Sequence, residues 1–302
     1  MSLRRTCATV ATVATALTLG VSAASSASAV AVPTIPSDCG VATFGVQSDN
    51  SITAFSYANG TQRTPGAIPS FGFTPQALVL AGEGAGEASG FTIYLVVDPA
   101  GNVINWRSDS KKQANGTWTT TVTKKTLATN WLQTRDIALV NGHLFRLSEA
   151  GGLYRYNYTS APTADGTSLT GGTTVGTNWQ AVKNIVGERR VTIGTSGTGA
   201  TRYGEVLLAN QSVDVLSEYT IPIDTPTAVV RKDLKSSGWA QYDSIATGRC
   251  SGHPGGRVIM AMRNSGLTQV VYDANASDGS GADLTVPRTA ETRFSATRLF
   301  GW

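Results

Sequence analysis

Residues Ala128–Tyr158, ATNWLQTRDIALVNGHLFRLSEAGGLYRYNY, carry the pattern that decides the fold of this chain. They contain three short apolar runs, which we expect to be strands: Thr129–Val140, His143–Leu147 and Leu153–Tyr156. The first two are separated by Asn141-Gly142, a typical hairpin turn, and the last two by a turn at Gly151-Gly152. Alternation with a period of two residues between glycine turns predicts an antiparallel meander rather than a helix.

The beginning of this pattern, an aromatic residue followed six positions later by an apolar one, occurs five times in the chain. The pairs are Phe73 and Val79, Trp131 and Ile137, Trp179 and Ile185, Trp239 and Ile245, and Phe294 and Phe300. Consecutive aromatic residues are 58, 48, 60 and 55 positions apart. These steps match the size of one four-stranded propeller blade with loop insertions.

The two ends of the chain each carry an incomplete repeat. A turn and apolar strand near Ile52 has no aromatic strand before it, and the aromatic strand near Phe294 has no hairpin after it. Joining the two ends completes a fifth unit and removes the exposed sheet edges of an open array. The sequence therefore predicts an all-β fold, a five-bladed β-propeller closed by its N- and C-terminal strands.

The N-terminal residues have the features of a secretory signal peptide. Arg4 and Arg5 precede a mildly apolar run over Cys7–Val21, and small residues end at Ala27-Ser28-Ala29. The run is too short and too rich in threonine to span a membrane. We expect a signal peptide over residues 1–29, a single propeller domain over 30–302, and a secreted, extracellular protein.

The charge balance excludes some partners. Charged residues make up 15% of the chain, and its formal charge of +4 falls to +2 once Arg4 and Arg5 are removed. No cluster of lysine and arginine is longer than two residues. The sequence therefore predicts no nucleic-acid partner, and it leaves the oligomeric state open.

Cysteine usage predicts one disulfide. Cys7 leaves with the signal peptide, so Cys39 and Cys250 remain as an even pair in an oxidising compartment. Cys39 precedes the strand that completes the fifth blade, and Cys250 lies in the hairpin region of the preceding one. The alternative is two unpaired thiols.

The residues that could carry catalysis are few. His143 and His253 are the two histidines, and they fall on different predicted blades without closely spaced metal-ligating partners. No G-x-S-x-G nucleophile motif occurs. The glycine-rich loop expected over Gly82–Gly90 joins two strands, whereas a phosphate-binding loop leads from a strand into a helix. We expect no catalytic residues, no metal, no cofactor and no enzymatic activity.

The segments TNWLQTRDIALV, HLFRLS and GGLYRY in one unit, with ATFGVQ, TNWQAVKNIV and SSGWAQYDSIA in others, resemble the tachylectin family of five-bladed β-propeller lectins. The resemblance covers essentially all of the mature chain as a repeat pattern. It implies a carbohydrate-binding protein with sugar sites in the outer clefts between adjacent blades. The implied ligands are N-acetylated hexosamines, of the N-acetylglucosamine or N-acetylgalactosamine type.

The family carries an Asp-Asn-Trp element ahead of each Gly-Trp strand, and only Asn115-Gly116-Thr117-Trp118 resembles it in this chain. In sugar-binding sites an aromatic ring stacks on the apolar face of the sugar, while amide and carboxylate groups form hydrogen bonds with its hydroxyls. The candidate ligand-binding residues are Asn115, Trp118, Asn130, Trp131 and Tyr154. Each also has a structural interpretation: blade packing for the aromatic residues and turn formation for the asparagines.

Two other functions stay open. Some five-bladed propellers are glycoside hydrolases whose carboxylates surround the central channel. The candidate carboxylates of this chain do not share one strand position: Asp98, Asp136, Asp214 and Asp243. The other alternative is a propeller with a protein-interaction or structural role.

Overall fold

The computed structural model describes residues 34–302, apart from 48, 59–60, 69, 162–165, 264, 266, 292–297 and 301–302. The strands among the described residues pair into five four-stranded sheets. The first contains β20 (Arg298–Phe300), β1 (Gly40–Val46), β2 (Ile52–Ala58) and β3 (Thr61–Ile68). The second contains β4 (Ala77–Ala85), β5 (Ser89–Val97), β6 (Val103–Lys112) and β7 (Trp118–Ala128).

The remaining three sheets follow the same order of consecutive antiparallel strands. The third contains β8 (Thr134–Val140), β9 (His143–Ser148), β10 (Leu153–Thr159) and β11 (Ser168–Gly176). The fourth contains β12 (Val182–Thr195), β13 (Thr201–Gln211), β14 (Leu216–Pro222) and β15 (Val230–Lys235). The fifth contains β16 (Ser244–Arg249), β17 (Arg257–Met262), β18 (Thr268–Asp273) and β19 (Arg288–Glu291).

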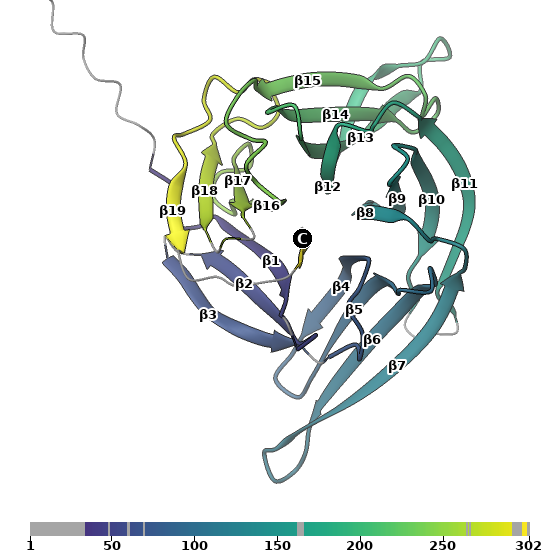
Figure 1. Cartoon of the computed structure of the whole chain (residues 1–302), viewed down its shortest axis with the longest axis vertical. Helices are drawn as coiled ribbons and strands as arrows, with labels where there is room; N and C mark the ends of the chain where they lie inside the picture. Colours follow the sequence, from purple (N-terminus) through teal and green to yellow (C-terminus); the bar gives the residue numbers. More distant parts are fainter. Residues whose placement is uncertain are drawn as a thin grey trace, which may run out of the picture. The chain divides into compact units, whose positions relative to one another are not determined.

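The sheets are arranged around a common centre, so the predicted all-β propeller architecture is confirmed (Figure 1). In each sheet, the apolar residue of the repeat lies on the innermost strand, which is the strand nearest the common centre (Figure 1). These residues are Val79 on β4, Ile137 on β8, Ile185 on β12, Ile245 on β16 and Phe300 on β20. The repeat therefore marks the innermost strand of every sheet.

The hydrophobic core is divided into five clusters, each between two neighbouring sheets. Members of each cluster come from two sheets, such as Phe44 and Tyr94, Val79 and Ile137, Val140 and Ile185, Val186 and Ile259, and Val41 and Val258. Every sheet thus buries both of its faces against neighbours. The C-terminal strand contributes as well, because β20 pairs antiparallel with β1, with Phe300 opposite Phe44.

Two local predictions were wrong. Trp131 precedes β8 instead of starting it, because Asn130 and Gln133 adopt left-handed backbone angles, φ 65° and 59°, that end an extended chain. The glycine-rich stretch Gly82–Gly90 is mostly strand, since β4 runs to Ala85 and β5 begins at Ser89.

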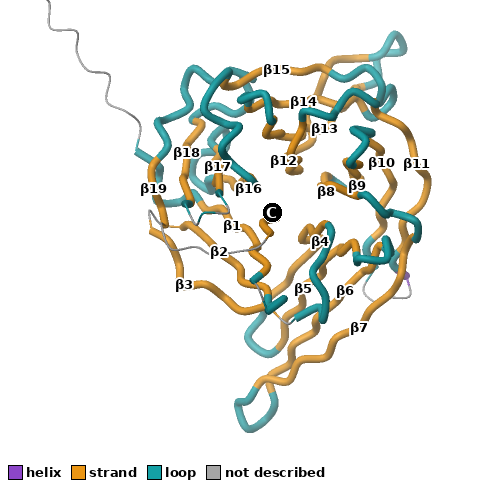
Figure 2. Tube along the Cα trace, viewed as in Figure 1, coloured by secondary structure: helices purple, strands orange, loops and turns teal. Residues whose placement is uncertain are grey.

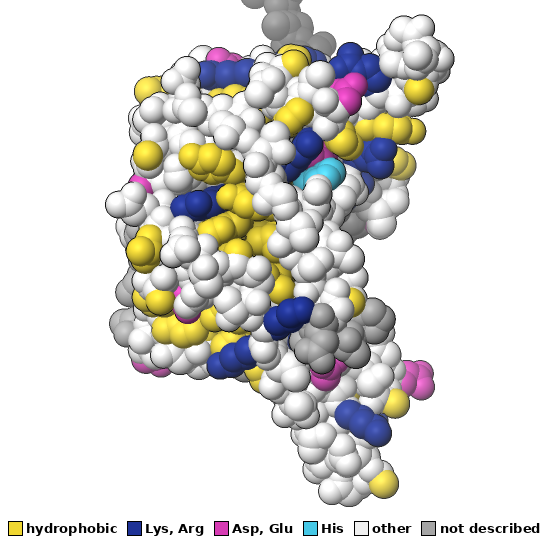
Figure 3. Space-filling view, turned by 90° about the vertical axis from the view of Figure 1, so that its right-hand side faces the viewer, with side chains coloured by type: hydrophobic (Ala, Val, Ile, Leu, Met, Phe, Trp, Pro, Cys, Tyr) yellow, Lys and Arg dark blue, Asp and Glu magenta, His cyan; other side chains and the backbone are white. Residues whose placement is uncertain are grey.

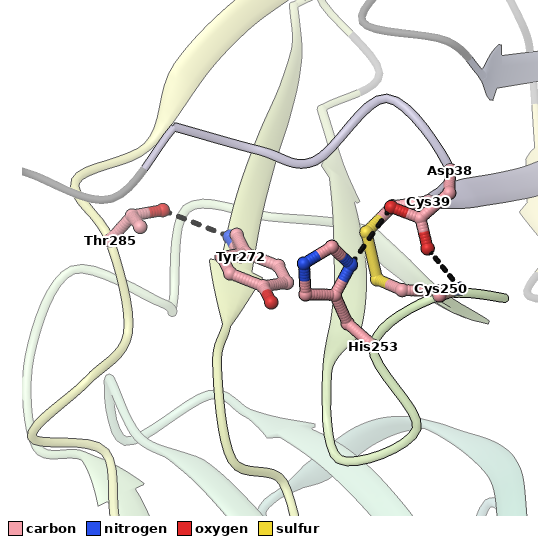
Figure 4. The surroundings of a disulfide bond; sticks show 7 residues. Asp38, Cys39, Cys250, His253, Tyr272 and Thr285 are labelled. Atoms are coloured by element: carbon pink, nitrogen blue, oxygen red, sulfur yellow. Dashed lines mark hydrogen bonds and ion pairs between the residues drawn. A yellow bond between two sulfur atoms is a disulfide. The ribbon is translucent and has the colours of Figure 1, made fainter.

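The predicted disulfide between Cys39 and Cys250 is confirmed, and it joins the start of β1 to the end of β16 (Figure 4). Its neighbour Asp38 also contacts the fifth sheet's loop. Oδ1 of Asp38 lies 2.9 Å from Nδ1 of His253, and Oδ2 accepts a hydrogen bond from the amide of Gly252. The N-terminal strand is therefore fastened to the fifth sheet by one covalent bond and by the Asp38 carboxylate.

Candidate functional site

The second sheet extends beyond the ring as an arm, which we define as residues 82–92 and 107–124 (Figures 1 and 2). The arm consists of the outer parts of β4, β5, β6 and β7. Figure 3 shows it projecting from the lower end of the molecule, with charged and hydrophobic side chains along it. Because it lies outside the core, its side chains are free to contact a ligand.

Successive side chains of the arm point to opposite sides of the sheet. The paired registers place two sets of side chains on its two faces. We name them after one member each. The Trp118 face carries Glu83, Thr92, Ser108, Ser110, Lys112, Trp118, Thr120 and Val122, and the Arg107 face carries Phe91, Arg107, Asp109, Lys111, Thr119 and Thr121.

The Trp118 face contains a cavity of about 480 Å³ whose lining includes Glu83, Thr92, Ser108 and Ser110. The hydroxyl of Ser110 lies 3.1 Å from that of Thr120, which is two residues from Trp118 on the same face. Trp118 is 51% exposed. This face thus combines an open aromatic ring, a row of hydroxyl groups, one carboxylate and the ammonium group of Lys112, which lies opposite Trp118.

The inner part of this face continues into the interface with the first sheet. Trp106 and Tyr94 oppose each other on β6 and β5, and both rings meet Phe71 edge to face, at 4.6 and 5.9 Å between centroids. The ammonium group of Lys124 lies 3.8 Å from the centroid of the Trp106 ring. A packed aromatic cluster therefore supports the Trp118 face at its base.

The Arg107 face contains the other arm cavity, of about 690 Å³. At its base, Asn105 accepts a hydrogen bond of 3.5 Å from the hydroxyl of Tyr158 in the third sheet. The inner continuations of the two faces therefore lie at two different boundaries between sheets.

Two of the predicted ligand residues lie at the tip of the arm. Asn115 accepts hydrogen bonds from the amide of Thr117, at 3.0 Å, and from its hydroxyl, at 2.7 Å. Gly116 has a φ of +84°. Asn115 thus shapes the turn between β6 and β7 that precedes Trp118.

The other three predicted residues lie at the third sheet. Trp131 is 4% exposed, and its ring lies 4.6 Å from that of Tyr156. The guanidinium of Arg146 covers Trp131 at 5.0 Å and Tyr154 at 5.8 Å. Asn130 is exposed and adopts a left-handed backbone angle. Arg146 thus brings Trp131 and Tyr154 together in a packed arrangement.

The five predicted residues do not form one site. Trp118 begins β7 and Asn130 follows its other end, and at 3.3 Å per residue the strand separates them by about 33 Å. The polar residues on the arm's cavities, such as Glu83, Ser108 and Ser110, were not predicted. A usable signal was present in Arg107–Lys112, where polar residues occupy every position, as they do in a strand with two solvated faces.

The four candidate carboxylates for a central catalytic site make separate structural contacts. Asp98 accepts amide hydrogen bonds within its turn, from Ala100 and Asn102. Asp136 bridges the third and fourth sheets, because it accepts hydrogen bonds of 2.9 Å from the backbone amides of Ile137 and Ile185. Asp214 accepts a hydrogen bond of 2.8 Å from the backbone amide of Ala240. Oδ1 of Asp243 lies 3.5 Å from the ammonium nitrogen of Lys183.

A different set of acidic residues converges between the fourth and fifth sheets. Arg257 is 1% exposed and contacts Glu188, Glu218 and Asp273 at 2.6, 2.9 and 2.7 Å. Burial raises the pKa of Asp273 to about 6, and the Arg257 charge opposes that shift. In the part of the chain that the structure describes, no His, Cys, Asp and Glu group could hold a metal, and no helix could cross a membrane.

No protein-family model and no curated protein matches this chain. Three solved structures are similar to it in arrangement. The BP39L lectin of Burkholderia pseudomallei has 12% identity and a TM-score of 0.39, covering 83% of this chain and 81% of its own. The SapL1 lectin, in complex with alpha methyl fucoside, has 11% identity and a TM-score of 0.34, covering 85% and 81%. A functionally unknown protein of Desulfotomaculum acetoxidans has 8% identity and a TM-score of 0.34, covering 88% and 87%.

Proposed function

We propose that this protein is a secreted carbohydrate-binding protein that recognises N-acetylated hexosamines on the Trp118 face of the arm. The observation that carries the proposal is the indole of Trp118, 51% exposed on the same face of the arm as a cavity lined by a carboxylate and hydroxyl groups. A large aromatic side chain in water gains free energy when an apolar surface covers it. The C–H face of a hexose and the methyl of an acetamido group are such surfaces.

The polar groups of the same face supply the directional contacts. Glu83 offers carboxylate oxygens that accept hydrogen bonds from ring hydroxyls, and Ser110 and Thr92 offer hydroxyls that donate or accept. A few polar groups beside an apolar plate are typical of small-ligand sites. The inner part of this face meets the first sheet at Tyr94 and Trp106, which supports the expectation, taken from the tachylectin resemblance, that sugars bind in outer clefts between blades.

The same proposal includes the organisation of the chain. Residues 1–29 act as the signal peptide, and residues 30–302 form one propeller whose five blades are closed by β20 and β1. The pairing of Phe44 with Phe300 supports the closure, and the bond between Cys39 and Cys250 supports an oxidising, extracellular location. Asn115 takes part by setting the turn before Trp118. Asn130, Trp131 and Tyr154 remain predicted ligand residues at a separate location.

A glycan array probed with the mature protein tests the proposal. We expect binding to glycans that end in N-acetylglucosamine or N-acetylgalactosamine, with elution by the free sugar. Trp118→Ala lowers the affinity about tenfold or more, as expected for an aromatic residue at the centre of a contact. The control is Tyr203→Ala, which removes an exposed aromatic ring from the fourth sheet. An array without hits, or equal losses in both variants, contradicts the proposal.

The outer edge of β7 favours a second candidate function, a protein-interaction role. All but the last few residues of this strand are exposed, and it is the outermost strand of its sheet. Unpaired backbone groups on an edge strand can accept a strand from another protein. This function predicts co-purification of a partner protein in the absence of glycan binding.

A further inference from the structure

We infer that the Arg107 face is a second binding site, separate from the Trp118 face, that takes a negatively charged saccharide: a sugar whose carboxylate or sulfate group lies beside its hydroxyls. The ligand class differs from the neutral amino sugar proposed above. The evidence comes from the shape of the cavity, the fixed position of one arginine and a neighbouring lysine.

Glycine residues leave space for the cavity on the Arg107 face. Gly84 and Gly86 line it without side chains, and an added Cβ at Gly84 would lie 2.5 Å from the ring of Phe91. The absence of a side chain at Gly84 lets the Phe91 ring lie against the strand. At about 690 Å³, the space is large enough for more than one sugar ring.

Arg107 is held rigidly at this cavity. Its Nε donates to both oxygens of Asp109, at 3.0 and 2.8 Å, and one terminal nitrogen donates to Oδ1 at 2.8 Å. Its guanidinium also lies 4.6 Å from the centroid of the Phe91 ring. The hydrogen bond to Asp109 raises the pKa of Arg107, so the guanidinium stays charged. These contacts use the N–H of Nε and one N–H of Nη2, which leaves Nη1 and the second N–H of Nη2 to donate to a ligand.

Lys111 makes the local charge positive. It is exposed two residues beyond Asp109 on the same face, and its ammonium group has no partner among the described residues. Asp109 already neutralises Arg107, so Lys111 leaves a net charge of one positive unit. An anionic group beside Lys111 would receive a charge-assisted hydrogen bond from its ammonium group, and the sugar hydroxyls would extend toward Asp109 and Arg107.

The remaining groups select a saccharide over a bare anion. Asp109 is 45% exposed, so its oxygens can accept hydrogen bonds from hydroxyls next to the anionic group. Thr121 lines the cavity beside it and opposes Asp109 across the two strands. A hydroxyl-poor anion would leave Asp109 without a favourable contact, whereas a uronic acid or sulfated sugar supplies both kinds of group.

Titration calorimetry with tetragalacturonate and with its methyl ester tests this site, because the two ligands share their hydroxyls and differ in charge. We expect the acid to bind, more tightly at low salt, and the ester to bind at least tenfold more weakly. Lys111→Gln lowers the affinity for the acid about tenfold, the loss of one charge-assisted hydrogen bond. Inorganic sulfate should compete only weakly.

The matched control is Lys112→Gln, because Lys112 is exposed next to Lys111 but points to the opposite face. We expect it to leave binding of the acid unchanged, and Trp118→Ala to leave it unchanged too. Equal binding of acid and ester, equal losses in the two lysine variants, or sulfate competing as strongly as the saccharide would each overturn the inference. If Trp118→Ala loses hexosamine binding and still binds the acid, that result concerns the Trp118 face and leaves the inference about the Arg107 face intact.

Discussion

The amide of Trp131 donates a hydrogen bond of 2.8 Å to the carbonyl of Gly101, so a turn of one sheet holds the leading aromatic residue of the next. The relationship recurs one sheet further on, where the amide of Trp179 donates to the carbonyl of Gly151 at 3.0 Å. Both glycines have positive φ angles, 78° and 80°. These contacts hold Trp131 and Trp179 at the boundaries between sheets, where both are buried, at 4% and 6% exposed.

Replacing Gly101 should destabilise the protein strongly. A Cβ there would lie 2.5 Å from the amide nitrogen of Leu132, in addition to the strain of a left-handed angle. We expect Gly101→Ala to lower the free energy of unfolding by about 2 to 4 kcal/mol in urea titrations. The control is Gly116→Ala, which measures the cost of a left-handed backbone angle without a steric contact, because Gly116 has a φ of +84° and open space around it. Its expected cost is about 1 to 2 kcal/mol, and equal losses would refute the role of the contact.

The disulfide should contribute substantially to stability. It links positions 211 residues apart. Closing so long a loop restricts the unfolded chain, and the chain-entropy model gives about 5 kcal/mol. We expect the double variant Cys39→Ser, Cys250→Ser to unfold at a lower denaturant concentration by about this free energy. An unfolding curve that coincides with that of the unreduced wild type would argue against it.

Asp273 should make stability depend on pH. Its pKa is raised to about 6 in the folded protein, mainly by burial, against an ordinary value near 3.9 in the unfolded chain. The folded state therefore holds this proton more tightly, and stability is lost as pH rises from about 4 through 6. Arg257 and Asp283 act on the same carboxyl with opposite signs.

The measurement compares wild type with Asp273→Asn in urea titrations across this range. The amide cannot titrate, so we expect the wild type to lose stability relative to the variant as the pH rises. Glu188 and Glu218 share Arg257 and are present in both proteins, so their contributions cancel to first order. Parallel stability profiles for the two proteins would show that Asp273 does not titrate in this range.

Phe300 should be essential to the first sheet. It is 2% exposed, pairs with Phe44, and packs in the cluster between the first and second sheets. Phe300→Ala is expected to cost about 3 to 5 kcal/mol in the free energy of unfolding, the usual range for a buried phenylalanine. Phe55→Ala on β2 is the control, because Phe55 is only partly buried. If the two variants lose the same stability, the C-terminal strand is not a major part of the core.

Local features that depend on neighbouring residues were predictable. The turn at Asn141-Gly142, the strands around it and the apolar positions such as Ile137 follow from period-two alternation and turn chemistry, which a short stretch of chain contains. The burial of Trp131 was not predictable from a short stretch of chain. Its burial depends on Gly101 and Arg146, which precede and follow it by 30 and 15 positions.

From the linear sequence we could predict that the chain is all β, which residues repeat on the inner strand of each sheet, and that Cys39 pairs with Cys250. These properties follow from alternation, spacing and composition, which are properties of the linear chain. Three features arise in the folded protein and could not be predicted: Trp118 is exposed while Trp131 is buried, the arm carries two cavities, and Arg257 contacts three carboxylates. Burial and charge pairing depend on which residues face each other across two sheets, and folding alone brings those residues together.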